Sequence, residues 1–272
     1  MSEKAEPPPS QGTEERRPTD PASTPPALTA ADFAANLATI RARIDAACAR
    51  VGRAPSEVEL LPVSKTVPAE RLRLAYEAGM RKLGENKVQE AREKAEALAD
   101  LDDLRWAVIG NLQTNKAKYV ARFAHEFHAL DRLKVAEELD RRLQVEGRAL
   151  DVYVQVNSSG ESSKFGLAPD EVTAFVCELP AFTALRVRGL MTLALFSSDL
   201  ERVRRCFVVM RELQDRLRQE TPDGLSFDGL SMGMSGDFEV AIEEGATVVR
   251  VGQSIFGARA VPDSHYWPGA TT

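Results

Sequence analysis

One lysine of this 272-residue chain follows closely on an apolar run of the sequence. The run covers Val58–Val63, and Lys65 comes two residues after its end. Partial removal from water lowers the pKa of an amine, and the neutral amine can attack a carbonyl carbon. The sequence therefore makes Lys65 a candidate carbonyl nucleophile, and the alternative is an ordinary solvated loop lysine.

Two glycine-rich turns near the carboxyl end of the chain could bind a phosphate. The first is Ser231–Asp237 (SMGMSGD), and the second is Gly252–Gly257 (GQSIFG). Glycines let the backbone come close to a ligand, and backbone N–H groups and serine hydroxyls donate hydrogen bonds to phosphate oxygens. Two such turns favour a phosphate site, and the alternative is a pair of tight turns without a ligand.

Arg250 lies just before the second of these turns. Its guanidinium stays protonated at neutral pH, so it would donate a hydrogen bond to any ring nitrogen that it met. A carbonyl-reactive lysine, a phosphate site and a donor for a heteroaromatic nitrogen together describe pyridoxal 5'-phosphate (PLP) as the ligand. The alternative for Arg250 is a salt bridge with Asp or Glu.

Histidines and cysteines give weaker signals. His125 and His128 lie three positions apart in an expected strand, so their side chains should face opposite sides and pack in the core or at the rim. No metal site is predicted. The cysteines are Cys48, Cys177 and Cys206, and their odd number and wide spacing predict free thiols, each buried like a small apolar residue.

The elements that must position these residues alternate along the chain in the manner of a parallel α/β fold. We expect strands at Val58–Val63, Lys82–Leu83, Trp106–Ile109, Glu126–Ala129, Asp151–Val156, Arg186–Leu190, Gly229–Met232 and Thr247–Val251. Helices are expected at 31–52, 68–79, 87–99, 114–122, 132–146, 169–178, 199–219 and 236–244. Eight strands with helices between them predict a single (β/α)8 TIM barrel. Two features fit less well, since the second strand is short and polar and Pro62 removes a backbone donor from the first.

In such barrels functional residues gather at the carboxyl ends of the strands. Asn86 and Met191 occupy such positions after the second and sixth expected strands, as does Gln253 after the eighth. We include them, with the residues above, among the candidates for cofactor binding.

The first 30 residues differ from the rest of the chain. They hold seven of its 15 prolines and no Val, Ile, Phe, Tyr or Trp. Such a segment cannot bury enough apolar surface to become ordered, so residues 1–30 are predicted to be a disordered tail and 31–265 a single barrel domain. A proline-rich docking motif is the alternative for the tail.

Composition excludes some classes of partner. The chain has 35 basic and 41 acidic residues, a net charge of −6, which argues against binding to nucleic acid or to an anionic membrane surface. It has no apolar run of transmembrane length, and its start lacks the apolar core of a signal peptide. A cytoplasmic protein is expected.

Seven ordered stretches of the chain resemble the pyridoxal phosphate homeostasis protein (YggS/PROSC) family. They are Leu61–Pro68 (LPVSKTVP), Leu83–Gln89 (LGENKVQ), Ile109–Lys116 (IGNLQTNK), Val156–Gly166 (VNSSGESSKFG), Arg188–Met191 (RGLM), Leu230–Asp237 (LSMGMSGD) and Val249–Arg259 (VRVGQSIFGAR). The resemblance runs from about residue 31 to 259 and implies a barrel similar to the N-terminal domain of alanine racemase. It also implies PLP held covalently as an aldimine on Lys65, with contacts from Asn86, Ser235, Arg250, Gly252 and Gln253.

The chain departs from the family pattern at three positions. A histidine is common in the family where this chain has Ala107, and another where it has Asn111. The position of Gln253 is usually threonine, although the glutamine amide could still donate a hydrogen bond.

Two functions from different classes remain. The first, implied by the resemblance, is a monomeric PLP carrier that takes part in vitamin B6 homeostasis and delivers the cofactor to apo-enzymes. The second is a PLP-dependent amino-acid racemase, which would need a second base, typically a tyrosine, opposite the lysine. None of Tyr76, Tyr119, Tyr153 and Tyr266 is a clear candidate, and the 15 residues after Gly257 are too few for the domain that supplies it in alanine racemase. The carrier is therefore favoured, and a barrel for another phosphorylated metabolite remains a third possibility.

Overall fold

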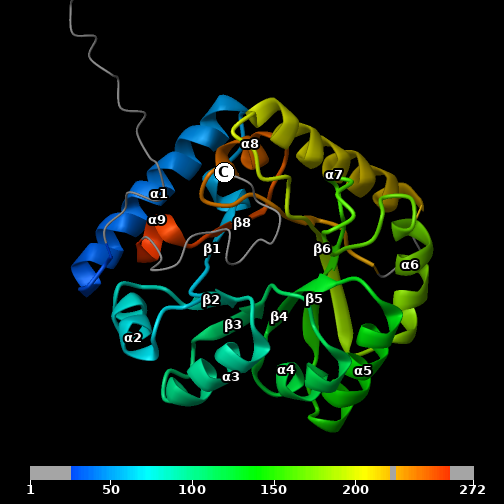
Figure 1. Ribbon diagram of the computed structural model, residues 1–272, viewed down its shortest axis with the longest axis horizontal. Coiled ribbons are helices and arrows are strands. Elements are labelled where there is room, and N and C mark those ends of the chain that lie inside the picture. Colours follow the sequence, from blue (N-terminus) through cyan, green and yellow to red (C-terminus); the bar gives the residue numbers. More distant parts are fainter. Residues whose placement is uncertain (1–25, 221–224, 258–272) are drawn as a thin grey trace, which may run out of the picture.

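The computed structural model describes residues 26–220 and 225–257, which form a barrel of eight parallel strands (Figure 1). The strands are β1 (Glu59–Pro62), β2 (Lys82–Glu85), β3 (Arg105–Val108), β4 (Glu126–Leu130), β5 (Leu150–Gln155), β6 (Leu185–Met191), β7 (Gly229–Ser231) and β8 (Val248–Val251). Their order in the sheet is β1-β8-β7-β6-β5-β4-β3-β2. A single bridge between Val63 and Gly84 and a hydrogen bond from Ser64 N to Gly84 O (2.9 Å) join the two ends of that order. The predicted TIM barrel is confirmed.

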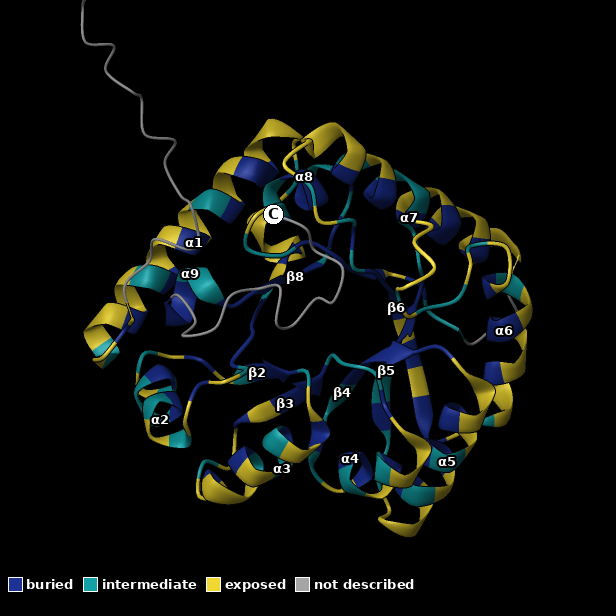
Figure 2. Cartoon of the chain, in the orientation of Figure 1, coloured by how far each residue is buried: buried dark blue, intermediate teal, exposed yellow. Residues whose placement is uncertain are grey.

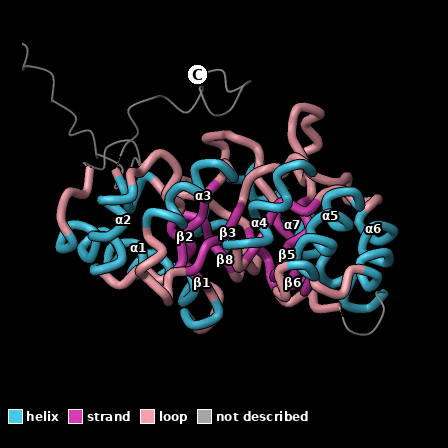
Figure 3. Tube along the Cα trace, turned by 90° about the horizontal axis from the view of Figure 1, so that it is seen from below, coloured by secondary structure: helices cyan, strands magenta, loops and turns pink. Residues whose placement is uncertain are grey.

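Helices surround the strands on the outside (Figures 1 and 3). They are α1 (Ala30–Arg50), α2 (Ala69–Glu77), α3 (Val88–Ala97), α4 (Ala117–Phe123), α5 (Leu133–Val145), α6 (Val172–Glu178), α7 (Leu200–Glu220), α8 (Phe238–Glu243) and α9 (Gln253–Phe256), with short 3-10 turns at Pro55–Glu57, Thr114–Lys116 and Leu179–Ala181. Every expected helix lies within a few residues of an observed one. The four-residue α9 was not predicted, because it is too short to show a helical period.

The pattern of apolar residues explains this arrangement. In α5 the buried Val135, Leu139 and Leu143 recur every four residues, so one stripe of the helix faces the strands. All four residues of β8 are buried, as expected for a parallel strand covered on both sides. Figure 2 shows the buried residues on the strands and on the inward faces of the helices.

The position of Pro62 fits the barrel for a simple reason. Glu59 N donates to Thr247 O and Val63 N donates to Val251 O, so alternate residues of β1 point their N–H groups toward β8. The nitrogen of Pro62 therefore faces β2, and β2 meets the β1 segment only from Val63 onward. The missing donor costs no ladder hydrogen bond.

The start of the described chain already contacts the barrel. Ala27 is buried, and its carbonyl oxygen accepts hydrogen bonds from Arg71 at 2.7 and 3.1 Å. Thr29 and Asp32 cap α1 with reciprocal hydrogen bonds. Ala27 and Thr29 lie before the predicted domain start at residue 31. Most of the predicted tail (1–25) and the predicted end at residue 265 lie outside the described residues.

The free cysteines and the lengths of the helices complete the fold. Cys48 and Cys206 are buried as predicted, whereas Cys177 is exposed on α6, so the prediction of burial was wrong for that residue. Among the described residues, no helix has the length and apolar character needed to span a membrane.

Candidate functional site

Lys65 lies just beyond the carboxyl end of β1, in a short segment held on both sides. Ser64 before it is fully buried, and its hydroxyl donates to Glu85 Oε1 at 2.6 Å. After it, Thr66 has a φ of 68°, a left-handed conformation that is uncommon for a β-branched residue. Its N–H donates to Glu90 Oε1 at 2.6 Å. The backbone around Lys65 is therefore fixed by acidic side chains of its neighbours β2 and α3.

A buried ion cluster organises those acidic side chains. Lys94 Nζ, on α3, donates to Glu85 Oε1 (2.6 Å), to Glu90 Oε1 (2.6 Å) and to the Ser64 carbonyl oxygen (2.8 Å). The side chain of Glu85 is wholly inaccessible to solvent. Burial raises the pKa of Glu85, and Lys94 opposes that shift. The cluster connects α3 to the loop that carries Lys65.

The two glycine-rich turns meet at the same end of the barrel. Gly252 N donates to Ser235 Oγ at 3.3 Å, and Arg250 N donates to Gly233 O at 2.9 Å. Gly233 has a φ of 93°, and a Cβ atom there would lie 2.6 Å from the Cβ of Ala241, so only glycine fits. The first turn packs directly on α8. Its Ser235 hydroxyl accepts the hydrogen bond from Gly252 of the second turn.

The guanidinium of Arg250 lies inside this end of the barrel. Only 3% of the residue is exposed. Its Nη1 donates to Ser231 Oγ and its Nη2 to the carbonyl oxygen of Thr192, both at 2.7 Å. Burial lowers the pKa of Arg250 to about 10, which leaves it protonated at neutral pH. Within the described parts of the chain no carboxylate forms an ion pair with it, so the salt-bridge alternative was wrong there.

The remaining candidates lie at the same ends of their strands. Asn86 directly follows β2, and its carbonyl oxygen is so close to Gly110 that a Cβ atom there would lie 2.0 Å from it. Met191 is the last residue of β6 and is buried, next to Thr192. Gln253 is the first residue of α9. The fold thus brings all seven candidates to one end of the barrel, and their contacts with a cofactor stay a prediction.

The family departures have simple structural settings. Ala107 is buried within β3. Asn111 takes part in a polar rim, where its Nδ2 donates to Asp131 Oδ2 at 3.4 Å and its Oδ1 accepts from Arg132 at 3.3 Å. This rim connects the loops after β3 and β4.

Sequence reasoning missed three residues: Ser231 contacts Arg250 directly, whereas Lys94 and His128 contact the neighbours of candidates, Ser64 and Ser231. In the sequence Lys94 is part of an ordinary helix, His128 is expected only to pack, and Ser231 is only part of a turn. His128 is fully buried in β4 and contacts Ser231 Oγ at 2.9 Å, which brings it next to the partner of Arg250. A histidine between the apolar residues Phe127 and Ala129 of a strand was the available signal, since a buried polar group must find a partner.

Comparison with known proteins identifies the family. Residues 35–260 match the family model described as alanine racemase, N-terminal domain. The pyridoxal phosphate homeostasis protein of Aquifex aeolicus is 45% identical over 226 residues, which are 82% of this chain and 96% of that protein. The protein of the same name from Escherichia coli is 43% identical over 233 residues, 84% and 97% of the two chains. The chain belongs to the pyridoxal phosphate homeostasis protein family.

Solved structures agree with the family and the fold. PipY from Synechococcus elongatus, solved with PLP bound, is 36% identical and has a TM-score of 0.73, with 83% of this chain and all of PipY covered. A protein from Bifidobacterium adolescentis is 32% identical with a TM-score of 0.79, covering 86% of this chain and all of its own. Alanine racemase from Streptomyces lavendulae, at 16% identity and a TM-score of 0.63 over 87% of this chain and 59% of its own, shows the fold alone.

Proposed function

We propose that this chain binds PLP and takes part in intracellular vitamin B6 homeostasis, as a cytoplasmic monomer that holds the cofactor on Lys65 and gives it up to apo-enzymes. The names of the relatives and the PLP-bound structure of PipY support the cofactor. The observation that carries the proposal is Arg250. It is a buried guanidinium that contacts only neutral oxygens among the described residues, beside the turns of Ser235 and Gly252.

The residues present fit the three parts of PLP. The Ser235 hydroxyl and the backbone N–H groups of the two turns can donate charge-assisted hydrogen bonds to the phosphate. A guanidinium has five N–H groups, and Ser231 and Thr192 accept from two of them, so donors remain for the ring nitrogen. When bound, the cofactor would supply an aldehyde, and the Lys65 amine would be the group that holds its carbonyl carbon covalently, with loss of water.

The same geometry favours a carrier over a racemase. An arginine partner leaves the ring nitrogen unprotonated, which weakens the cofactor as an electron sink. The Tyr76 hydroxyl donates to Asp103 on the outside of the barrel. The ring of Tyr119, on α4, packs under the guanidinium of Arg92, on α3. Tyr153 is buried in β5, packed on His128 and against Gly229 at the start of β7. These contacts engage each of the three described tyrosines elsewhere in the fold, and Tyr266 lies outside the described residues.

Two substitutions separate covalent capture from phosphate binding. Lys65→Ala should abolish the yellow absorbance and the incorporation seen after borohydride reduction and peptide mapping, yet leave measurable binding of PLP. Ser235→Asp, which sets a carboxylate against the phosphate, should lose retention on dialysis even though Lys65 is present. Lys87→Ala, at an exposed lysine near the same end, is the matched control and should behave like the parent.

Specific outcomes contradict these assignments. Trapping that persists in Lys65→Ala would move the covalent bond to another lysine. Full retention by Ser235→Asp would show that the phosphate site is misplaced. A purified parent protein that binds no PLP at all would favour another phosphorylated metabolite.

A further inference from the structure

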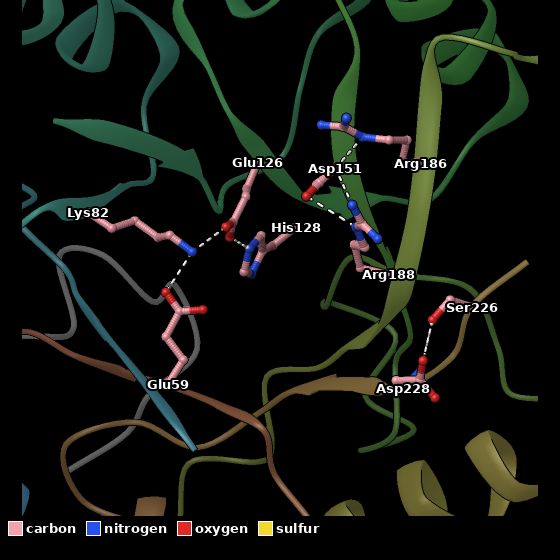
Figure 4. Close-up of polar contacts among 9 residues, drawn as sticks. All are labelled: Glu59, Lys82, Glu126, His128, Asp151, Arg186, Arg188, Ser226 and Asp228. Atoms are coloured by element: carbon pink, nitrogen blue, oxygen red, sulfur yellow. Dashed lines mark hydrogen bonds and ion pairs between the residues drawn. The ribbon is translucent and has the colours of Figure 1, made fainter. Parts of the chain in front are cut away.

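A chain of hydrogen bonds runs through the inside of the barrel and ends on Arg250. Ser231 Oγ accepts from Arg250 Nη1 and lies 2.9 Å from His128 Nδ1. His128 Nε2 lies 2.8 Å from Glu126 Oε2. Glu126 pairs with Lys82, which is also 2.6 Å from Glu59 Oε1 (Figure 4).

This series of side-chain contacts connects the two ends of the barrel. Glu59, Lys82 and Glu126 are the first residues of β1, β2 and β4, at the amino ends of the strands. His128 lies two residues further along β4, and Ser231 is the last residue of β7. Because all strands are parallel, the contacts lead from the amino ends toward the end that carries Lys65.

A neutral His128 ring fixes which groups of this hydrogen-bond network donate and which accept. A guanidinium only donates, so the Ser231 oxygen accepts from Arg250 and its hydroxyl hydrogen is free for His128 Nδ1. Burial opposes the ionisation of Glu126, but the hydrogen bond with His128 and the positive charge of Lys82 outweigh it and lower the pKa of Glu126, so this group is a carboxylate at neutral pH. Burial lowers the pKa of His128 and so favours the neutral ring. Its Nε2–H donates to the Glu126 carboxylate, and its Nδ1 accepts from Ser231.

The charged side chains at the far end of this hydrogen-bond network have a net charge opposite to that of Arg250. Glu59, Lys82 and Glu126 together carry two negative charges and one positive charge, a net charge of −1. Arg250 carries +1 and contacts only the oxygens of Ser231 and Thr192. Polarised hydrogen bonds in a low-dielectric interior strengthen one another. The carboxylate whose charge acts on Arg250 through space is that of Asp237, and Ser231, backed by His128, holds the guanidinium by a hydrogen bond.

We infer that His128 is a positioning residue for the cofactor site: through Ser231 it fixes the guanidinium of Arg250 and sets its hydrogen bond to the ring nitrogen of bound PLP. This inference rests on the proposed function. It assigns His128 a role beyond its packing on Tyr153, whose ring centre lies 4.2 Å away. His125, by contrast, accepts from the backbone N–H of Trp106 at 3.2 Å and has no part in the chain.

The test compares PLP with an analogue whose ring nitrogen is replaced by C–H. Ser231→Ala and His128→Leu should each weaken binding of PLP about tenfold, the loss expected for one hydrogen bond to a charged group. The same variants should bind the analogue as the parent does, because the contact they disturb is absent from it. His128→Gln keeps one donor and one acceptor and should restore part of the affinity for PLP. Tyr153→Phe, which keeps the packed ring, is the matched control and should leave both affinities unchanged.

Nitrogen NMR of the histidine rings gives a readout that needs no cofactor. In the parent protein His128 should be the neutral Nε2–H tautomer, and Arg250→Lys should shift its Nδ1 signal while that of His125 stays in place. Equal losses for PLP and for the analogue would overturn the inference and leave His128 a structural role. A His128 ring protonated at Nδ1 would also overturn it. The parent protein could bind no PLP and yet show the neutral Nε2–H tautomer of His128 with the expected response to Arg250→Lys. The proposed function would then fail, whereas the hydrogen-bond network through His128 and Ser231 would be supported.

Discussion

Replacing Lys94 by methionine should destabilise the fold and loosen the segment that carries Lys65. Methionine keeps the length and packing of the lysine stem but removes the ammonium, which contacts Glu85, Glu90 and the Ser64 carbonyl oxygen. The side chain of Glu85 is fully buried and that of Lys94 is 8% exposed, so the substitution leaves a buried carboxylate without its counter-ion. Removing one partner of such a pair costs about 3–5 kcal/mol. Glu90 is more exposed and adds little.

Urea unfolding followed by circular dichroism measures this loss. For a domain of this size it corresponds to a fall in melting temperature of roughly 10 °C. The Glu85→Gln, Lys94→Met double variant is the control, because a neutral amide can stay buried where a lone carboxylate cannot. It should recover more than half of the lost free energy of unfolding.

The loss should also depend on pH. Burial raises the pKa of Glu85 in the folded protein, and without Lys94 that pKa rises further. A carboxyl group with a raised folded pKa adds stability at low pH, and this contribution disappears as the pH rises through that pKa. The difference between parent and Lys94→Met should therefore be small around pH 4.5, close to the ordinary pKa of a glutamate, and larger near pH 8. A variant within about 0.5 kcal/mol of the parent at pH 8, the range of ordinary surface substitutions, would refute the buried-pair reasoning.

Three further predictions concern other parts of the chain. Gly233→Ala, at a φ of 93° and with its Cβ directed into Ala241, should lower the free energy of unfolding by about 1–3 kcal/mol, measured by urea unfolding, and weaken retention of PLP on dialysis; parent-like values would contradict the packing of that turn. Deleting residues 1–25 should leave the melting temperature unchanged, whereas deleting 1–28 also removes the Ala27 carbonyl that Arg71 contacts and should lower it. The protein loaded with PLP should not interconvert L- and D-alanine, and chiral chromatography that found turnover at about 1 per second, an enzyme-like rate, would support the racemase instead.

The sequence was sufficient for the barrel because its apolar runs are clear and evenly separated by helices. Even the short, polar second strand was found, since Lys82–Leu83 lies between two amphipathic helices and β2 extends only to Glu85. The candidate residues at the strand ends followed from the general rule that parallel barrels place function there.

The parts that could not be predicted depend on contacts between distant positions. Lys94 is an ordinary helical lysine in the sequence, and only the fold places its ammonium against Ser64, 30 residues earlier. The contact between His128 and Ser231 spans 103 residues and depends on strand register across the barrel. The exposed Cys177 shows the same limit, because the facing of a short helix is fixed by its packing and not by residue type.

The closure of the barrel has a consequence for its motions. β1 and β2 stand at opposite ends of the strand order, and Val63–Gly84 is their bridge. By comparison, β5 and β6 share six register pairs. Few backbone hydrogen bonds cross this seam, so its local opening is governed by the side chains of Lys94, Glu85 and Ser64. Lys65 directly follows Ser64, whose N–H crosses the seam to Gly84, so any local opening of the seam would move the segment that carries Lys65.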